Sequence, residues 1–214
     1  ENISQLKDGH DVELLRSWAE ISDGKNQALD EISKLVGGVP LALFLIGRYL
    51  VSRDQDIKDY LARLKKSTLK ALDETNSPSL GITIVLDQSF SVLDTEGMHA
   101  LTCIGTLANA PFEKEVIAQM MDVEDFEIGK ILGDLVNIGL LTRNGTQYSL
   151  LHNLIHAFAR NKASLLDEKE QERHYHVLAK HYLQRAQECG EEGADCLGAI
   201  EPHVIAVLQK LDEQ

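Results

Sequence analysis

The sequence predicts a mainly helical fold in three parts: a small helical bundle, a winged-helix domain with a two-stranded wing, and the start of an α-helical repeat. Apolar residues recur at helical spacing along most of the chain, with only four prolines and 5% aromatic residues. The pair Asn144-Gly145 separates two short segments with the pattern of strands. We place the three parts at residues 1–78, 79–163 and 164–214.

The first part is expected to hold four amphipathic helices. Gly37-Gly38 ends the second helix, and Pro40 suits the first turn of the third, where its missing N–H costs nothing. The third helix is apolar nearly all round, which predicts a central position in the bundle. A polar stretch over residues 73–78 is interpreted as a linker. The predicted helices cover residues 13–21, 27–36, 41–51 and 57–72.

The second part has the element order of a winged helix. An apolar helical pattern over residues 82–93 precedes three helices, the Asn-Gly hairpin and one further helix. Three helices followed by a two-stranded wing elaborate the helix-turn-helix motif. The tail is expected to form two helices joined by an acidic loop over residues 190–195. The predicted helices cover residues 96–107, 113–121, 126–138, 152–163, 165–189 and 197–211.

Charge and cysteine content exclude several classes of protein. The formal net charge is −13 and no third of the chain is basic, so general binding to nucleic acid or to an anionic membrane is not expected. The longest apolar run, residues 40–47, is too short to span a membrane. Three cysteines without CxxC spacing indicate neither a disulfide framework nor a zinc site, and favour a cytoplasmic location. The opening at Glu1 in a helical pattern predicts a piece of a longer protein.

The sequence does not predict an enzyme. It contains no GxxxxGK[ST] phosphate loop and no HExxH or GxSxG motif, so catalytic residues are not assigned. Two groups of histidines have spacings compatible with metal binding, but neither has a carboxylate or thiolate positioned beside it by the local sequence. We therefore expect no metal site. These groups are His152/His156 and His174/His176/His181.

Reading of DNA by the third helix of the winged helix is the first alternative function. This helix, residues 124–138, has four acidic residues and one basic residue, a net charge of −3. The hairpin adds only Arg143. Recognition helices normally bring Arg, Lys, Asn or Gln to base edges and phosphates, so repulsion disfavours this alternative. The charged residues are Glu124, Asp125, Glu127, Lys130 and Asp134.

Three motifs follow one another along the first two parts of the chain: Gly38-Val39-Pro40-Leu41-Ala42-Leu43, residues 87–93 and Leu151-His152-Asn153. In this order they resemble the NB-ARC class of STAND nucleotide switches. Gly38-Val39-Pro40-Leu41-Ala42-Leu43 looks like the GxPLAL motif of that class, and residues 87–93 are similar to the segment that opens its winged helix. Leu151-His152-Asn153 stands where the class has Met-His-Asp. The resemblance covers about residues 3–163, and the tail looks like the start of a TPR-like array.

The resemblance implies a regulatory role in a longer parent protein. Pro40 would pack against the adenine of bound nucleotide and His152 would contact the β-phosphate of ADP, whereas Asn153 replaces the usual aspartate. ADP or ATP would bind the parent, which could be a slow ATPase, and neither nucleotide is expected to bind this chain tightly. The implied partners are an upstream P-loop domain, downstream repeats, a protein or ligand trigger, and further copies in an oligomer. Membrane and nucleic acid are not expected as partners.

Two alternatives remain open beside the switch. One is a winged-helix transcription regulator that binds DNA. The other is a protein-interaction scaffold that needs no nucleotide.

Overall fold

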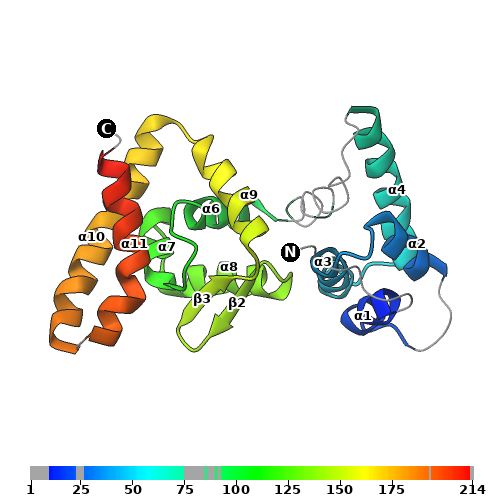
Figure 1. Cartoon of the computed structure of the whole chain (residues 1–214), viewed down its shortest axis with the longest axis horizontal. Coiled ribbons are helices and arrows are strands. Elements are labelled where there is room, and N and C mark those ends of the chain that lie inside the picture. Colours follow the sequence, from blue (N-terminus) through cyan, green and yellow to red (C-terminus); the bar gives the residue numbers. More distant parts are fainter. Residues whose placement is uncertain are drawn as a thin grey trace. The chain divides into compact units, whose positions relative to one another are not determined.

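The computed structural model describes residues 10–22, 27–74, 85, 90, 93–192 and 194–212, which fall into two compact units (Figure 1). The N-terminal unit comprises Glu1–Leu93 with Asn137–Gly139, and the C-terminal unit comprises Asp94–Val136 with Leu140–Gln214. Helices dominate both units, and the strands form one small antiparallel sheet. The mainly helical fold predicted from the sequence is confirmed.

The described residues of the N-terminal unit include four helices in the predicted order. Gly37 and Gly38 both adopt positive φ, which ends the second helix as expected. The first helix stops three residues before the predicted end, and Glu20 then has a φ of 53°. Most of the predicted linker lies outside the described residues. The helices are α1 (His10–Trp18), α2 (Gln27–Leu35), α3 (Pro40–Ser52) and α4 (Ile57–Glu74).

Helix α3 provides much of the core of this unit, as its apolar composition predicts. Gly47 lies where α3 meets α1: a Cβ atom built on it would come within 2.5 Å of the Trp18 Cβ. The Trp18 ring packs edge-on against Phe44, with ring centroids 5.4 Å apart. Ser33 on α2 donates a hydrogen bond to Asp11 on α1, and Lys65 on α4 pairs with Glu31 on α2. The fully buried residues of α3 are Ala42, Leu43, Leu45 and Ile46.

The C-terminal unit contains the winged helix and the tail helices. Asp94 caps its first helix by accepting a hydrogen bond from the Gly97 N–H at 2.7 Å. The helical pattern over residues 82–93 falls in the N-terminal unit. Of this pattern, only Val85, Phe90 and Leu93 lie within the described residues, and Val85 and Phe90 are buried. The helices are α6 (Thr95–Ile104), α7 (Lys114–Met121), α8 (Asp125–Asn137), α9 (Asn153–Ser164), α10 (Glu168–Glu192) and α11 (Ala194–Asp212).

The sheet has three strands in the order β1-β3-β2, so the prediction of two strands was incomplete. Strands β2 (Leu141–Asn144) and β3 (Gln147–Leu150) form the predicted hairpin. Strand β1 (Phe112–Glu113) pairs with the other side of β3 and is too short to give an alternating pattern. The turn residues are Gly145 and Thr146, since Asn144 still pairs with Gln147. Gly145 has a φ of 61° and Thr146 is not among the positive-φ residues, which indicates a type II′ turn.

The tail packs as two long helices beside the winged helix (Figure 1). The loop predicted over residues 190–195 is wrong, because α10 continues to Glu192 and α11 begins at Ala194. Helix α10 contacts both α11 and α7. Cys189 is buried and disulfide-bonded, a bond that the number and spacing of the cysteines did not indicate.

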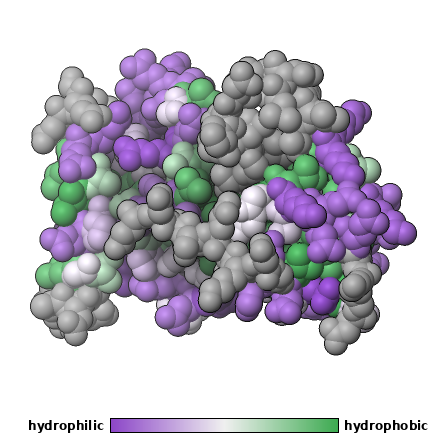
Figure 2. Space-filling view, turned by 45° about the vertical axis from the view of Figure 1, so that its right-hand side comes forward, coloured by the Kyte–Doolittle hydropathy of each residue, from purple (hydrophilic) through white to green (hydrophobic). Residues whose placement is uncertain are grey.

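In the part of the chain that the structure describes, no helix combines the length and apolar character needed to cross a membrane. Figure 2 shows hydrophilic residues over much of the coloured surface in that view, with hydrophobic residues in separate patches between them. The largest exposed fraction among the exposed large hydrophobic residues is 87%, at Phe126 near the start of α8.

Candidate functional site

Pro40 occupies the first turn of α3. The preceding residue, Val39, is the N-cap with extended backbone angles, and its side chain makes no capping hydrogen bond. The proline ring is partly exposed, whereas Ala42 and Leu43 immediately after it are fully buried. The GxPLAL motif therefore forms a corner between two helices and holds Pro40 in a fixed position at its surface.

His152 is the N-cap of α9. Its Nδ1 accepts a hydrogen bond from the Leu154 N–H at 3.1 Å, which satisfies one of the free backbone donors at the helix start. When Nδ1 acts as an acceptor, the proton of a neutral imidazole lies on Nε2. The side chain is exposed. His152 therefore offers one N–H donor to the surroundings while its other nitrogen serves the helix.

Asn153, the first residue of α9, has a structural contact of its own. Its Oδ1 accepts a hydrogen bond from the Asn109 side chain at 2.8 Å, which ties the start of α9 to the segment after α6. Pro40 belongs to the N-terminal unit and His152 and Asn153 to the C-terminal unit.

Helix α8, the candidate recognition helix, exposes an acidic surface. The five charged residues identified from the sequence are all exposed, and Asp125 pairs with Lys114 of α7 at 2.6 Å. Arg143 in the hairpin lies over the Tyr148 ring, 5.5 Å from its centroid. The exposed groups of α8 would meet a DNA phosphate backbone mainly with carboxylates.

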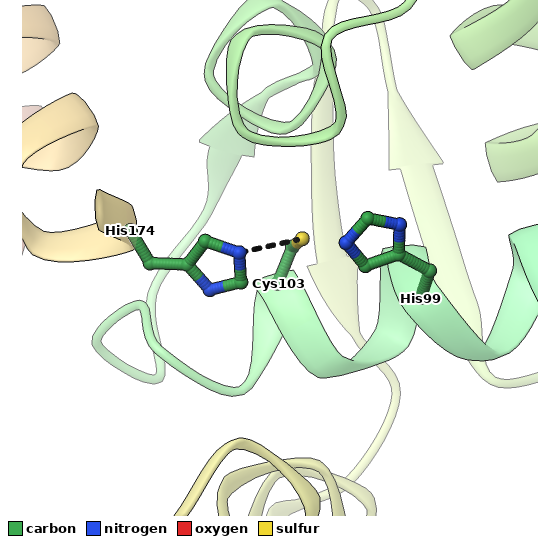
Figure 3. A group of neighbouring side chains, drawn as sticks. All are labelled: His99, Cys103 and His174. Carbon is green, nitrogen blue, oxygen red and sulfur yellow. Dashed lines mark hydrogen bonds between the residues drawn. The ribbon is translucent and has the colours of Figure 1, made fainter. Parts of the chain in front are cut away.

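A second group of side chains brings His99, Cys103 and His174 together (Figure 3). One ligand atom from each of the three lies within 4.8 Å of the other two. The Cys103 Sγ and the His174 Nε2 are 3.8 Å apart, and the two imidazole rings are stacked with centroids 6.3 Å apart. His99 and Cys103 are one turn apart on α6, and His174 comes from α10. Cys103 and His174 are fully buried, whereas His99 is half-buried.

Burial controls the protonation of this group. It raises the pKa of the Cys103 thiol to about 12, and it lowers the pKa of His174. Glu170 lies at the edge of the group, with its Oε1 3.3 Å from the His174 Nε2, and hydrogen bonds from Arg173 lower the pKa of this carboxyl. The His174 Nδ1 is buried without a hydrogen-bond partner among the described residues.

The histidine spacings noted in the sequence do not form metal-binding pairs among themselves. His156 donates from Nε2 to the Leu107 carbonyl oxygen at 3.0 Å, and His152 caps a helix, so both have structural contacts. His176 is exposed. The thiol that His174 meets comes from a residue 71 positions earlier in the chain. The i, i+4 pair of His99 and Cys103 was the available sequence signal, and it was missed.

A small pocket of about 180 Å³ lies where α10 and α11 meet the sheet. Its polar lining includes Glu113, Arg185 and His203. Arg185 pairs with Glu113 at 3.2 Å and with Glu188 at 2.9 Å, so its charge is already balanced by two carboxylates. His203 donates from Nε2 to the Pro111 carbonyl oxygen at 2.9 Å. This pocket does not present an excess of positive charge for a phosphate group.

The sequence matches no protein-family model and no curated protein. The class that the structure defines is a mainly helical protein with a small antiparallel sheet.

Proposed function

We propose that this chain is the regulatory part of a nucleotide-dependent switch of the NB-ARC or STAND type. The observation that supports this proposal best is that the two ring nitrogens of His152 have different roles. Its Nδ1 holds the start of α9, and its Nε2–H is a donor of fixed orientation. A donor held in this way can bind a phosphate oxygen of ADP without first losing side-chain freedom.

Pro40 would supply an apolar surface for the adenine. Its φ angle is fixed by the pyrrolidine ring, and it sits on a helix whose next turn is fully buried. A rigid, partly exposed ring of this kind suits stacking against a planar base. The phosphate loop itself would come from a P-loop domain outside this chain, so ADP or ATP would bind the parent protein.

In this proposal ADP stabilises a closed arrangement by contacting the P-loop domain, Pro40 and His152 at the same time. Exchange for ATP would remove the contact with His152 and release the winged helix. The nucleotide can shift this equilibrium only through its different affinities for the two arrangements. The tail helices α10 and α11 would connect the winged helix to downstream repeats that sense a trigger.

DNA binding by the winged helix is the second candidate function, and the surface of α8 argues against it. All five charged side chains of α8 and the residue before it are exposed, four of them acidic. Phe126, on the same helix, is 87% exposed, and an exposed aromatic residue favours contact with protein. A passive scaffold would share these features but would give His152 no role beyond its cap.

The test is ADP retention by the natural protein that contains this chain, with three variants of matched design. His152→Ala removes both the cap and the donor, whereas His152→Asn keeps a good N-cap and removes the imidazole. His176→Ala, at an exposed histidine of α10, is the control. We expect both His152 variants to release ADP about 10- to 100-fold faster, since a hydrogen bond to a charged group contributes about 1.5–3 kcal/mol.

Two results would overturn the proposal. One is unchanged ADP release in His152→Asn with the wild-type stability of the fold. The other is a coding region upstream of Glu1 that contains no P-loop domain. A low-salt shift of DNA by the wild-type chain, lost on Arg143→Ala, would favour the transcription regulator instead.

A further inference from the structure

We propose that His99, Cys103 and His174 form a zinc-binding site that joins α6 to α10 within the C-terminal unit. The proposal is independent of the nucleotide switch. It rests on three side chains with ligand atoms that converge on one point, as Figure 3 shows.

The positions of the three side chains fit a tetrahedral ion. His99 and Cys103 stand at i and i+4 on α6, so both point from the same face of that helix. Zinc binds sulfur at about 2.3 Å and imidazole nitrogen at about 2.0–2.1 Å, which places those two atoms about 3.6 Å apart in a tetrahedron. The observed distance from the Cys103 Sγ to the His174 Nε2 is 3.8 Å. Cys103 and His174 would thus need only a small movement to bind the ion, and the ligand atom of His99 lies within 4.8 Å of both.

The kinds of ligand select the ion. One thiolate and two imidazoles suit zinc, whereas magnesium and calcium prefer oxygen ligands. Three protein ligands leave a fourth position, and the Glu170 carboxylate lies beside the group, 3.3 Å from the His174 Nε2. His99 is only half-buried and provides a path for the ion to enter. Helix packing alone does not account for the group, because an apolar side chain would fill the place of His174 without leaving a buried nitrogen unpartnered.

Zinc binding would move two protons. The Cys103 thiol would lose its proton to solvent as the Zn–S bond forms, since the thiolate is the ligand. The single proton of neutral His174 would then reside on Nδ1, which has no acceptor among the described residues. That buried N–H weakens the site relative to one in which every histidine has a second hydrogen bond. We therefore expect micromolar affinity that increases with pH.

The experiment is a titration of the chain with zinc in competition with a chromophoric chelator, and a parallel titration with cobalt(II). Cobalt should give the absorption band that arises from charge transfer between a thiolate and the metal. We expect Cys103→Ala to lose this band. Cys103→Ala and His99→Ala should each weaken zinc binding by about 100-fold or more. Loss of a residue that only supports a metal ligand already weakens binding by about 10- to 100-fold, and these variants remove a ligand itself. His176→Ala, two residues from His174 on the exposed side of α10, should bind as the wild type does.

Thermal unfolding keeps the test informative if a variant folds poorly. Zinc should raise the Tm of the wild-type chain and leave the Tm of His99→Ala unchanged. We choose His99 for this comparison because its side chain is half-exposed, so that truncation should leave the fold intact. The proposal is overturned if the wild-type chain does not bind zinc at micromolar concentrations. It is equally overturned if Cys103→Ala retains the cobalt band, because another cysteine would then be the ligand.

Discussion

Replacement of Gly105 by alanine should destabilise the C-terminal unit strongly, although the backbone angles of Gly105 are ordinary. Its φ of −63° and ψ of −18° are available to any residue, so the effect comes from contact alone. A Cβ atom on Gly105 would lie 2.2 Å from the Ala159 carbonyl oxygen and 2.7 Å from the Arg160 backbone nitrogen. Both of these atoms belong to the backbone of α9, which has no side-chain rotamer to relieve the clash.

The loss of stability depends on how far α6 and α9 must move apart to make room for the new Cβ atom. Ordinary contacts of a Cβ begin near 3.4 Å, so α6 and α9 must separate by more than 1 Å. Overpacking of this kind costs about 1–3 kcal/mol, and we expect about 3 kcal/mol because the contact is with backbone. At about 2–4 °C for each kcal/mol, the Tm should fall by roughly 6–12 °C.

Urea unfolding followed by circular dichroism measures this change, and Gly133→Ala is the matched control. Gly133 lies within α8. Apart from its two chain neighbours and the nearby backbone of its own helix, no heavy atom lies within 4 Å of a Cβ built there. Alanine at that position should stabilise the helix by roughly 0.5–1 kcal/mol. If Gly105→Ala unfolds at the same urea concentration as Gly133→Ala, the argument that Gly105 allows α6 to pack closely on α9 is refuted.

Two further predictions concern pH and the hairpin. Burial lowers the pKa of His174, His181 and His203 in the folded chain. Below about pH 6.5 the unfolded chain therefore binds more protons than the folded chain, and the free energy of unfolding should fall as the pH decreases further. His203→Phe, which keeps a ring against Tyr182, should flatten this profile in urea unfolding at a series of pH values, and a slope equal to that of the wild type would contradict the assignment. Gly145→Ala should lower the free energy of unfolding by about 1 kcal/mol because φ is positive at this position, and Gly145→Asn should lower it less. Equal losses for the two variants in urea unfolding would show that the positive φ is not the cause.

Features that depend on neighbouring residues were predictable from the sequence. The corner at Gly37-Gly38-Val39-Pro40 and the apolar helix after it are encoded locally, and the structure confirms both. The hairpin is confirmed too, but its turn lies one residue later than the Asn-Gly pair indicated. Asn-Gly favours a type I′ turn, whereas pairing of Asn144 with Gln147 places Gly145 first in the turn, where type II′ requires glycine.

Features that depend on distant residues were not predictable in the same way. Strand β1 exists because it pairs with β3, and two residues carry no periodic signal of their own. His174 was assessed beside the histidines of its own helix, and its partner Cys103 lies on another helix. No local pattern relates the two positions. The helix predicted over residues 152–163 is confirmed, but it begins at Asn153, because His152 is its N-cap.

The contacts of β1 with the tail bear on how the chain can be shortened. The Pro111 carbonyl oxygen and the Glu113 carboxylate are held by His203 and Arg185, which both follow residue 163. A recombinant chain that ends there would lose both contacts, and β1 would keep only its pairing with β3 and its contacts with α7 among the described residues. Fraying of β1 would expose one side of β3, and unpaired strand edges of this kind associate with one another. Such a truncated protein should therefore be more prone to self-association than the chain of 214 residues.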